Sequence, residues 1–272
     1  MATHIHASAV IHPGATLGDN VTVGPLAVVE DQVVIGEGTT LGPHAVVMKY
    51  TTLGPRCQIH AHAVVGGWPQ DLAFNPETES FVRVGAECVI REGVTIHRGT
   101  KPGTVTELGQ RCFLMANSHV AHNGKLGNQV IMANDSMLGG YVEVGDQVFI
   151  SGNSAVHQFV RIGRLAMISG MSAVSKDVPP FCLLKNQRLN VVAGLNVIGL
   201  RRAGFAAPER LAIKRAFHTL YRSGLNVTQA LDQMEKDGLS GCLAEFHAFI
   251  KTSKRGICRF EGRHTETAAE EE

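Results

Sequence analysis

The sequence repeats an aliphatic residue at every sixth position, and this period constrains the fold more than any other feature. An α-helix would need apolar spacings of three and four, and an amphipathic strand would need a spacing of two. Between Ile5 and Val174 the period holds at 26 sites, all of them apolar. The sites are Ile5, Ile11, Leu17, Val23, Val29, Ile35, Leu41, Val47, Leu53, Ile59, Val65, Val84, Ile90, Ile96, Leu108, Leu114, Val120, Leu126, Met132, Leu138, Val144, Ile150, Val156, Ile162, Ile168 and Val174.

A small or β-branched residue usually follows four positions after each aliphatic residue, as at Ala9, Ala27 and Cys57. One large and one small interior position in six residues predict a short strand followed by a turn. Three such units, 18 residues, close one triangular coil, and coils stack at about 4.8 Å, the spacing of paired strands. The sequence therefore predicts an all-β parallel β-helix over residues 1–186.

The period is interrupted twice and then ends, which divides the chain. Residues at about 67–83 and 100–107 lack the pattern and are expected to form loops expelled from the coil, where chemistry is often found. After VPP at 178–180, three segments with helical apolar spacing predict a small C-terminal α-helical domain over 187–262. The acidic end, residues 263–272, is expected to be a disordered tail.

Composition excludes several classes of protein. A formal charge of +1 with 18% charged residues argues against nucleic-acid binding by bulk charge. No apolar run approaches the roughly 18 residues that span a membrane, and no secretory signal is recognisable. Six scattered cysteines without a CxxC pair indicate free thiols in a reducing compartment, so we expect a cytoplasmic protein without a metal or other cofactor.

The densest polar cluster, ANSHVAHNG at 116–124, contains His122, two positions after Val120 and therefore at a turn. Adding 18 gives Gly140 and adding 36 gives Gln158, so the three residues should stack about 5 Å apart. A histidine beside a bare peptide N–H is the minimal arrangement for acyl transfer, because it pairs a general base with a donor for the oxyanion. A merely exposed surface histidine is the simpler alternative.

With this cluster the chain resembles the bacterial UDP-N-acetylglucosamine O-acyltransferases of lipid A synthesis. The resemblance covers about residues 3–260, including the helical domain, and the combination of motifs is specific. The hexapeptide repeat alone is shared by many enzymes. The motifs are GGWPQDL (66–72), IREGVTIHRGT (90–100), NSHVAHN (117–123), SAVHQF (154–159), DVPP (177–180), GLNVIGLRRAGF (194–205) and TSKRGICR (252–259).

The resemblance implies a left-handed coil and a homotrimer with active sites between subunits. It implies transfer of a 3-hydroxyacyl chain from acyl carrier protein to the 3-hydroxyl of UDP-N-acetylglucosamine. His122 would be the general base and Gly140 the oxyanion donor, so Gly140→Ala, which keeps the amide, need not be as severe as His122→Ala. The remaining implied positions are Gln70 and Asp71 for the sugar, His119, His157 and Gln158 lining the cleft, Asn196 and Arg202 for the nucleotide, and Gly170 for acyl length.

Four residues depart from the family pattern. Asn123 stands where the family often has Asp, Ala73 replaces a lysine, Ala203 replaces a second arginine, and Tyr141 replaces a cleft histidine. Losing two cations should weaken phosphate contacts, which leaves the exact nucleotide sugar open. N-acylation of a related 3-amino sugar and a non-catalytic paralogue therefore remain alternatives.

A basic stretch over 161–202 would steer an acidic carrier protein. It holds seven cations against Asp177, although a solvated basic surface is the simpler alternative. The stretch contains Arg161, Arg164, Lys176, Lys185, Arg188, Arg201 and Arg202.

A zinc enzyme of the γ-carbonic-anhydrase type is a further alternative because that class shares the β-helix, but its histidine spacing does not match. The histidines that suggest it are His60, His62, His97, His119 and His122.

Overall fold

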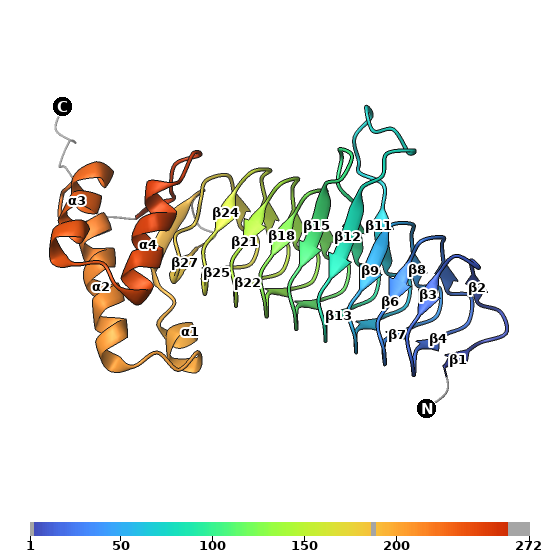
Figure 1. The fold of residues 1–272 in the computed structure, drawn as a ribbon. Helices are drawn as coiled ribbons and strands as arrows, with labels where there is room; N and C mark the ends of the chain where they lie inside the picture. Colours follow the sequence, from blue (N-terminus) through green and yellow to red (C-terminus); the bar gives the residue numbers. More distant parts are fainter. Residues whose placement is uncertain (1–2, 186–188, 261–272) are drawn as a thin grey trace, which may run out of the picture.

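The computed structural model, which describes residues 3–185 and 189–260, is a long three-walled coil that ends in a cluster of helices (Figure 1). The chain visits three parallel sheets in turn, called here walls A, B and C. Wall A contains β1 (His4–Ile5), β4 (Thr22–Val23), β7 (Thr40–Leu41), β10 (Gln58–Ile59), β13 (Val89–Ile90), β16 (Phe113–Leu114), β19 (Ile131–Met132), β22 (Phe149–Ile150), β25 (Met167–Ile168), β27 (Cys182–Leu184), β28 (Val191–Leu195) and β29 (Arg259–Phe260).

The other two walls are built in the same way. Wall B contains β2 (Val10–Ile11), β5 (Val28–Val29), β8 (Val46–Val47), β11 (Val64–Gly67), β14 (Thr95–His97), β17 (His119–Val120), β20 (Met137–Leu138), β23 (Ala155–Val156) and β26 (Ala173–Val174). Wall C contains β3 (Thr16–Leu17), β6 (Val34–Ile35), β9 (Thr51–Leu53), β12 (Phe81–Val84), β15 (Val105–Leu108), β18 (Lys125–Leu126), β21 (Glu143–Val144) and β24 (Arg161–Ile162).

Strand pairing confirms the predicted 18-residue coil. His4 pairs with Thr22, Val10 with Val28, and Thr16 with Val34, and all three ladders are parallel. The aliphatic residue of each unit points inward and is almost fully buried from Val23 onward, while Ile5 in the first coil is 51% exposed because no coil lies beneath it. The small positions are buried as well, including three cysteines at 0–1% exposure: Cys57, Cys88 and Cys112.

Most turns between walls place their second residue in the left-handed region, although it is often not glycine. Asn123, Tyr141 and Phe159 have φ values of 60°, 59° and 64°. Such a conformation costs roughly 1–2 kcal/mol for a residue with a Cβ, and pairing with the neighbouring coils holds it in place. It fixes the direction of these side chains along the corner where wall B turns into wall C.

Both expelled loops leave the coil at this same B–C corner, between β11 and β12 and between β14 and β15 (Figure 1). The predicted extents were too long, because the loops end at residues 80 and 104. Phe81 pairs with Val105 and Val82 with Thr106, so the two returning strands stabilise each other over four residues. The loops are called here the first loop (68–80) and the second loop (98–104).

The three predicted C-terminal helices are confirmed as α2 (Ala207–Arg222), α3 (Val227–Asp237) and α4 (Gly241–Lys251), preceded by a short α1 (Val197–Arg202). Strands β27, β28 and β29 were not predicted; β28 pairs antiparallel to β27 and β29 pairs with β28, which covers the open edge of wall A. The boundary at 186/187, Arg188 and the tail 263–272 lie outside the described residues. No described helix is long and apolar enough to span a membrane.

Candidate active site

His122 lies in the turn between β17 and β18, at the corner from which both loops emerge. His119 pairs with Met137, and Met137 pairs with Ala155, so the turns after these strands are in register. His122, Gly140 and Gln158 therefore occupy equivalent positions on three successive coils. The predicted column is confirmed.

The imidazole of His122 lies directly against Gly140. A Cβ added to Gly140 would be 2.6 Å from Nε2 and 3.1 Å from Nδ1 of His122, so the ring fills the space that a side chain would need. Within the described chain, no acceptor bonds the Gly140 backbone N–H. A ring nitrogen and an unused amide donor thus share one corner.

Asn123 sets which nitrogen of His122 carries the proton. Its Oδ1 accepts from the Thr100 backbone N–H at 3.1 Å, and because that group can only donate, the orientation of the carboxamide is fixed. The same Oδ1 lies 3.0 Å from Nδ1 of His122, so Nδ1 must donate as well. In the neutral ring, Nε2 is then the nitrogen that keeps its lone pair, and a general base requires such a lone pair. Asn123 thus sets the orientation of the ring.

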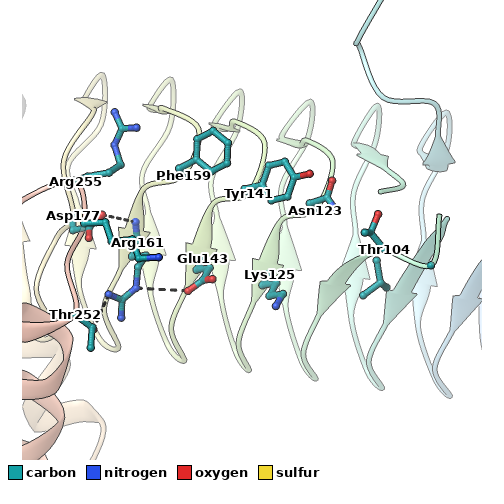
Figure 2. Close-up of a pocket in the computed structure, with 13 residues that line it drawn as sticks. Thr104, Asn123, Lys125, Tyr141, Glu143, Phe159, Arg161, Asp177, Thr252 and Arg255 are labelled. Carbon is teal, nitrogen blue, oxygen red and sulfur yellow. Dashed lines mark hydrogen bonds and ion pairs between the residues drawn. The ribbon is translucent and has the colours of Figure 1, made fainter. Parts of the chain in front are cut away.

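Aromatic side chains continue the corner beyond His122. The Tyr141 ring meets His122 edge to face at 5.3 Å and stacks on Phe159 at 5.0 Å. Figure 2 shows Asn123, Tyr141 and Phe159 on successive turns above a cavity of about 790 Å³. Cationic residues line the same cavity: Lys125, Arg161, Lys254 and Arg255.

His97, which is buried, and His119, which is partly buried, lie beside His122. His97 is 8% exposed, and burial followed by repulsion from His119 and His122 lowers its pKa to about 4. Burial also lowers the pKa of His119, whose Nδ1 is 2.7 Å from the Thr95 hydroxyl. Both rings are therefore neutral near pH 7. His119 was predicted for the cleft, whereas His97 was considered only as a zinc ligand.

The first loop carries Gln70 and Asp71, and both are exposed. Asp71 Oδ1 accepts from the Ala73 N–H at 2.9 Å, so in this structure its carboxylate caps a turn. Arg98, 3% exposed, donates to the Pro76 carbonyl at 2.7 Å and lies 5.3 Å from the Phe74 ring. Arg98 thus ties the first loop to the corner, a role that the sequence did not reveal.

The remaining predicted residues are divided among the three corners. His157 and Gln158 are exposed in a single turn of the B–C corner, between β23 and β24 and two coils beyond His122. Asn196 donates to the carbonyl of Leu165, at the corner between walls C and A, and lines a cavity of about 720 Å³ with Arg202. Gly170 is at the A–B corner. One chain therefore does not bring Asn196, Arg202 or Gly170 next to His122.

Within residues 3–185 and 189–260, no three His, Cys, Asp or Glu side chains are grouped as ligands for a metal ion. The cysteines are free, and five of the six are buried.

A β-helix of six-residue units, with a histidine ring packed against a bare glycine at one corner, is typical of a hexapeptide-repeat transferase. Residues 32–67 match the model of the bacterial transferase hexapeptide, and residues 177–258 match that of UDP N-acetylglucosamine O-acyltransferase, domain 2. A protein of Trichlorobacter lovleyi named acyl-[acyl-carrier-protein]–UDP-N-acetylglucosamine O-acyltransferase is 50% identical, covering 94% of this chain and 99% of its own. A protein of the same name from Syntrophobacter fumaroxidans is 41% identical at the same coverage.

Solved structures agree with these relatives. The UDP-N-acetylglucosamine acyltransferases of Bacteroides fragilis and Campylobacter jejuni align with TM-scores of 0.90 and 0.87, at 37% and 36% identity, over 94% of this chain and 100% of theirs. This chain belongs to the UDP-N-acetylglucosamine O-acyltransferase family. The expected fold class, a left-handed parallel β-helix with a small C-terminal helical region, is confirmed, and the zinc alternative is left without support.

Gly140→Ala should be severe, although alanine keeps the amide. Its Cβ would collide with the His122 ring, so the base must move, and we expect a loss of about 100-fold in kcat with little change in thermal stability. The control is Gly194→Ala, where the added Cβ meets no atom within 4 Å. Steady-state kinetics and thermal unfolding of both variants test this; full activity of Gly140→Ala would contradict the observed packing.

Proposed function

We propose that this protein transfers a 3-hydroxyacyl chain from acyl carrier protein to the 3-hydroxyl of UDP-N-acetylglucosamine, the first step of lipid A biosynthesis. The observation that carries the proposal is the contact of the His122 ring, whose Nδ1 faces Asn123, with Gly140, whose backbone N–H is unused. The names of the relatives support the two substrates. The free, mostly buried thiols suit a reducing compartment, in agreement with a cytoplasmic enzyme.

In the proposed reaction, acyl transfer is direct and forms no covalent enzyme intermediate. Nε2 of His122 takes the proton of the sugar 3-hydroxyl as that oxygen attacks the thioester carbonyl carbon. The Gly140 N–H stabilises the resulting oxyanion, a contribution of about 3 kcal/mol for one such donor. Collapse of the intermediate breaks the carbon–sulfur bond, and the proton held by His122 passes to the leaving thiol. The products are the 3-O-acyl sugar nucleotide and the carrier with a free thiol.

The sugar is proposed to bind at the B–C corner, between the first loop and the histidines. Gln70 and Asp71 would bond its hydroxyls after Asp71 releases the Ala73 amide, which is an exchange of one hydrogen bond for another. His119, His157 and Gln158 would line the cleft beyond the base.

The nucleotide end requires a second copy of the chain, because Asn196 and Arg202 lie at another corner. The outer face of wall A next to them is apolar and only partly covered in the single chain. The outer face of wall C is instead charged and alternates in sign from coil to coil. We propose that wall A packs on a neighbouring copy in a homotrimer. The wall A residues are Phe113, Ile131, Phe149, Met167 and Leu183, and those of wall C are Arg83, Glu107, Lys125, Glu143 and Arg161.

The acidic carrier is proposed to dock on exposed cations near the helical end. Two members of the predicted basic stretch are engaged elsewhere, since Arg164 pairs with Glu245 at 2.7 Å and Arg161 lies 3.6 Å from Glu143. Lys185, Arg201 and Arg202 remain exposed, and Lys254 adds a cation that lies outside the predicted stretch. These charges would favour encounter with an acidic protein.

Gly170 is proposed to limit the length of the acyl chain that the enzyme accepts. It lies at the A–B corner, where Met171 is 75% exposed, and its absent side chain leaves room against Ser151 and Gly152. Gly170 is close to three coils above His122 along the axis, or about 14 Å at the spacing of paired strands. This separation is comparable to the length of a long acyl chain.

Purified protein incubated with UDP-N-acetylglucosamine and a mixture of 3-hydroxyacyl carriers should form one acylated sugar nucleotide, detected by mass spectrometry. His122→Ala should reduce turnover by about 1,000-fold, because it removes the proposed general base. A 3-amino analogue of the sugar nucleotide tests N-acylation in parallel. Absence of product from the wild type would remove the proposed function, while an active His122→Ala would remove only its mechanism.

The trimer predicts a solution mass three times the 29.1 kDa of the chain, measurable by light scattering. Phe149→Lys places a charge on the apolar face of wall A and should dissociate the assembly and abolish turnover. Glu143→Lys, a charge change on wall C, should leave the assembly intact. A monomeric wild type that is fully active would contradict the shared site.

Gly170→Met should shift the preferred acyl chain to one shorter by several carbons, because the side chain would occupy the end of the proposed acyl path. Competition among carriers of different chain length, read by mass spectrometry, measures the shift. The control is Gly194→Met, at a position where an added Cβ meets no atom within 4 Å. An unchanged preference would place the acyl terminus elsewhere.

A further inference from the structure

We propose that Tyr141 is a positioning residue for the reaction, acting on His122 through Thr100 and Asn123. This inference rests on the proposed function, because it concerns how the base of that reaction is held. Asn123 and Tyr141 are two of the positions at which the sequence is expected to depart from the family pattern.

The hydrogen bonds form one continuous chain whose directions are all determined. Asn123 Oδ1 accepts from the Thr100 hydroxyl at 3.1 Å, in addition to the Thr100 N–H and Nδ1 of His122. The single hydroxyl proton of Thr100 is used in that bond. The Tyr141 hydroxyl, 3.1 Å from Thr100 Oγ1, must therefore be the donor to it. Protons thus point from Tyr141 to Thr100 and from Thr100 to Asn123.

The rest of the structure holds Tyr141 in place for this role. Its backbone is fixed in the left-handed turn conformation at φ 59°, and its ring stacks on Phe159 with an interplanar angle of 15°. Asn123 is 6% exposed, so water competes little for its carboxamide. In such surroundings successive hydrogen bonds polarise one another.

As a consequence, an uncharged side chain, Asn123, holds the ring of the proposed base His122. A carboxylate beside Nδ1 would stabilise the imidazolium directly by its charge. Here the carbonyl oxygen of Asn123, kept in position by two donors from Thr100 and indirectly by Tyr141, accepts from Nδ1–H while Nε2 gains its proton. The N–H···O bond to Asn123 becomes charge-assisted at that moment, so its orientation contributes to the transition state rather than to substrate binding.

Tyr141→Phe removes only the hydroxyl and keeps the ring stack. We expect kcat to fall about fivefold, the effect of losing one hydrogen bond, with the KM for the sugar nucleotide unchanged. Thr100→Val, which keeps the backbone N–H, should lower kcat about tenfold. Because Tyr141 acts only through Thr100, adding Tyr141→Phe to Thr100→Val should have no further effect.

Two matched variants serve as controls. Thr100→Ser retains a hydroxyl and should restore most of the activity lost in Thr100→Val. Tyr50→Phe removes a hydroxyl from the equivalent turn position four coils away, at φ 67°, and should leave kcat unchanged. All variants should unfold at the wild-type temperature within a few degrees.

Independent, multiplicative effects of Tyr141→Phe and Thr100→Val would overturn the proposal, as would a raised KM in Tyr141→Phe, which would indicate direct contact with substrate. An active wild type with an unaffected Tyr141→Phe would reject this inference and leave the proposed function intact. A wild type that forms no acylated product would reject the proposed function itself.

Discussion

Hydrogen bonding between coils 18 residues apart is the interaction on which the rest of the structure depends. Most strands of the coil contain only two residues, too few to persist alone, yet in the body of the coil each pairs with a strand above and another below. The ladder fixes the register of the turns as well as of the strands. This is why His122 and Gly140, far apart in sequence, lie in contact at one corner.

The features that repeat with the six-residue period could be predicted from the sequence, and those outside the repeat could not. The coil, its buried positions and the column of His122, Gly140 and Gln158 all derive from repeated spacing. The ends of the two loops were predicted too far along the chain because their returning strands stabilise each other across an insertion, a contact without periodic signal. Strands β28 and β29 were missed for the same reason. Their sequences are short, and they form only because wall A offers an open edge.

The candidate site shows the same limit. Thr100 lies in an expelled loop, outside the repeat, so no arithmetic could place its hydroxyl between Asn123 and Tyr141. The role of Arg98 could not be predicted either, because it depends on where the first loop places the Pro76 carbonyl. In the sequence, Asn123 and Tyr141 appeared as two separate departures from the family pattern. In the structure they are members of one hydrogen-bonded network, and the loss of a carboxylate is accompanied by a gain of donors.

A neutral network is suited to a corner as enclosed as this one. A carboxylate at the position of Asn123 would be nearly buried and would require compensation for its lost hydration, whereas an amide requires only its hydrogen bonds. The neighbouring rings are also uncharged, because burial lowers the pKa of both His97 and His119. In the proposed reaction no adjacent imidazolium then opposes the positive charge that develops on His122. That charge forms together with the oxyanion at Gly140, and the Nδ1–H bond to Asn123 is in place before either appears.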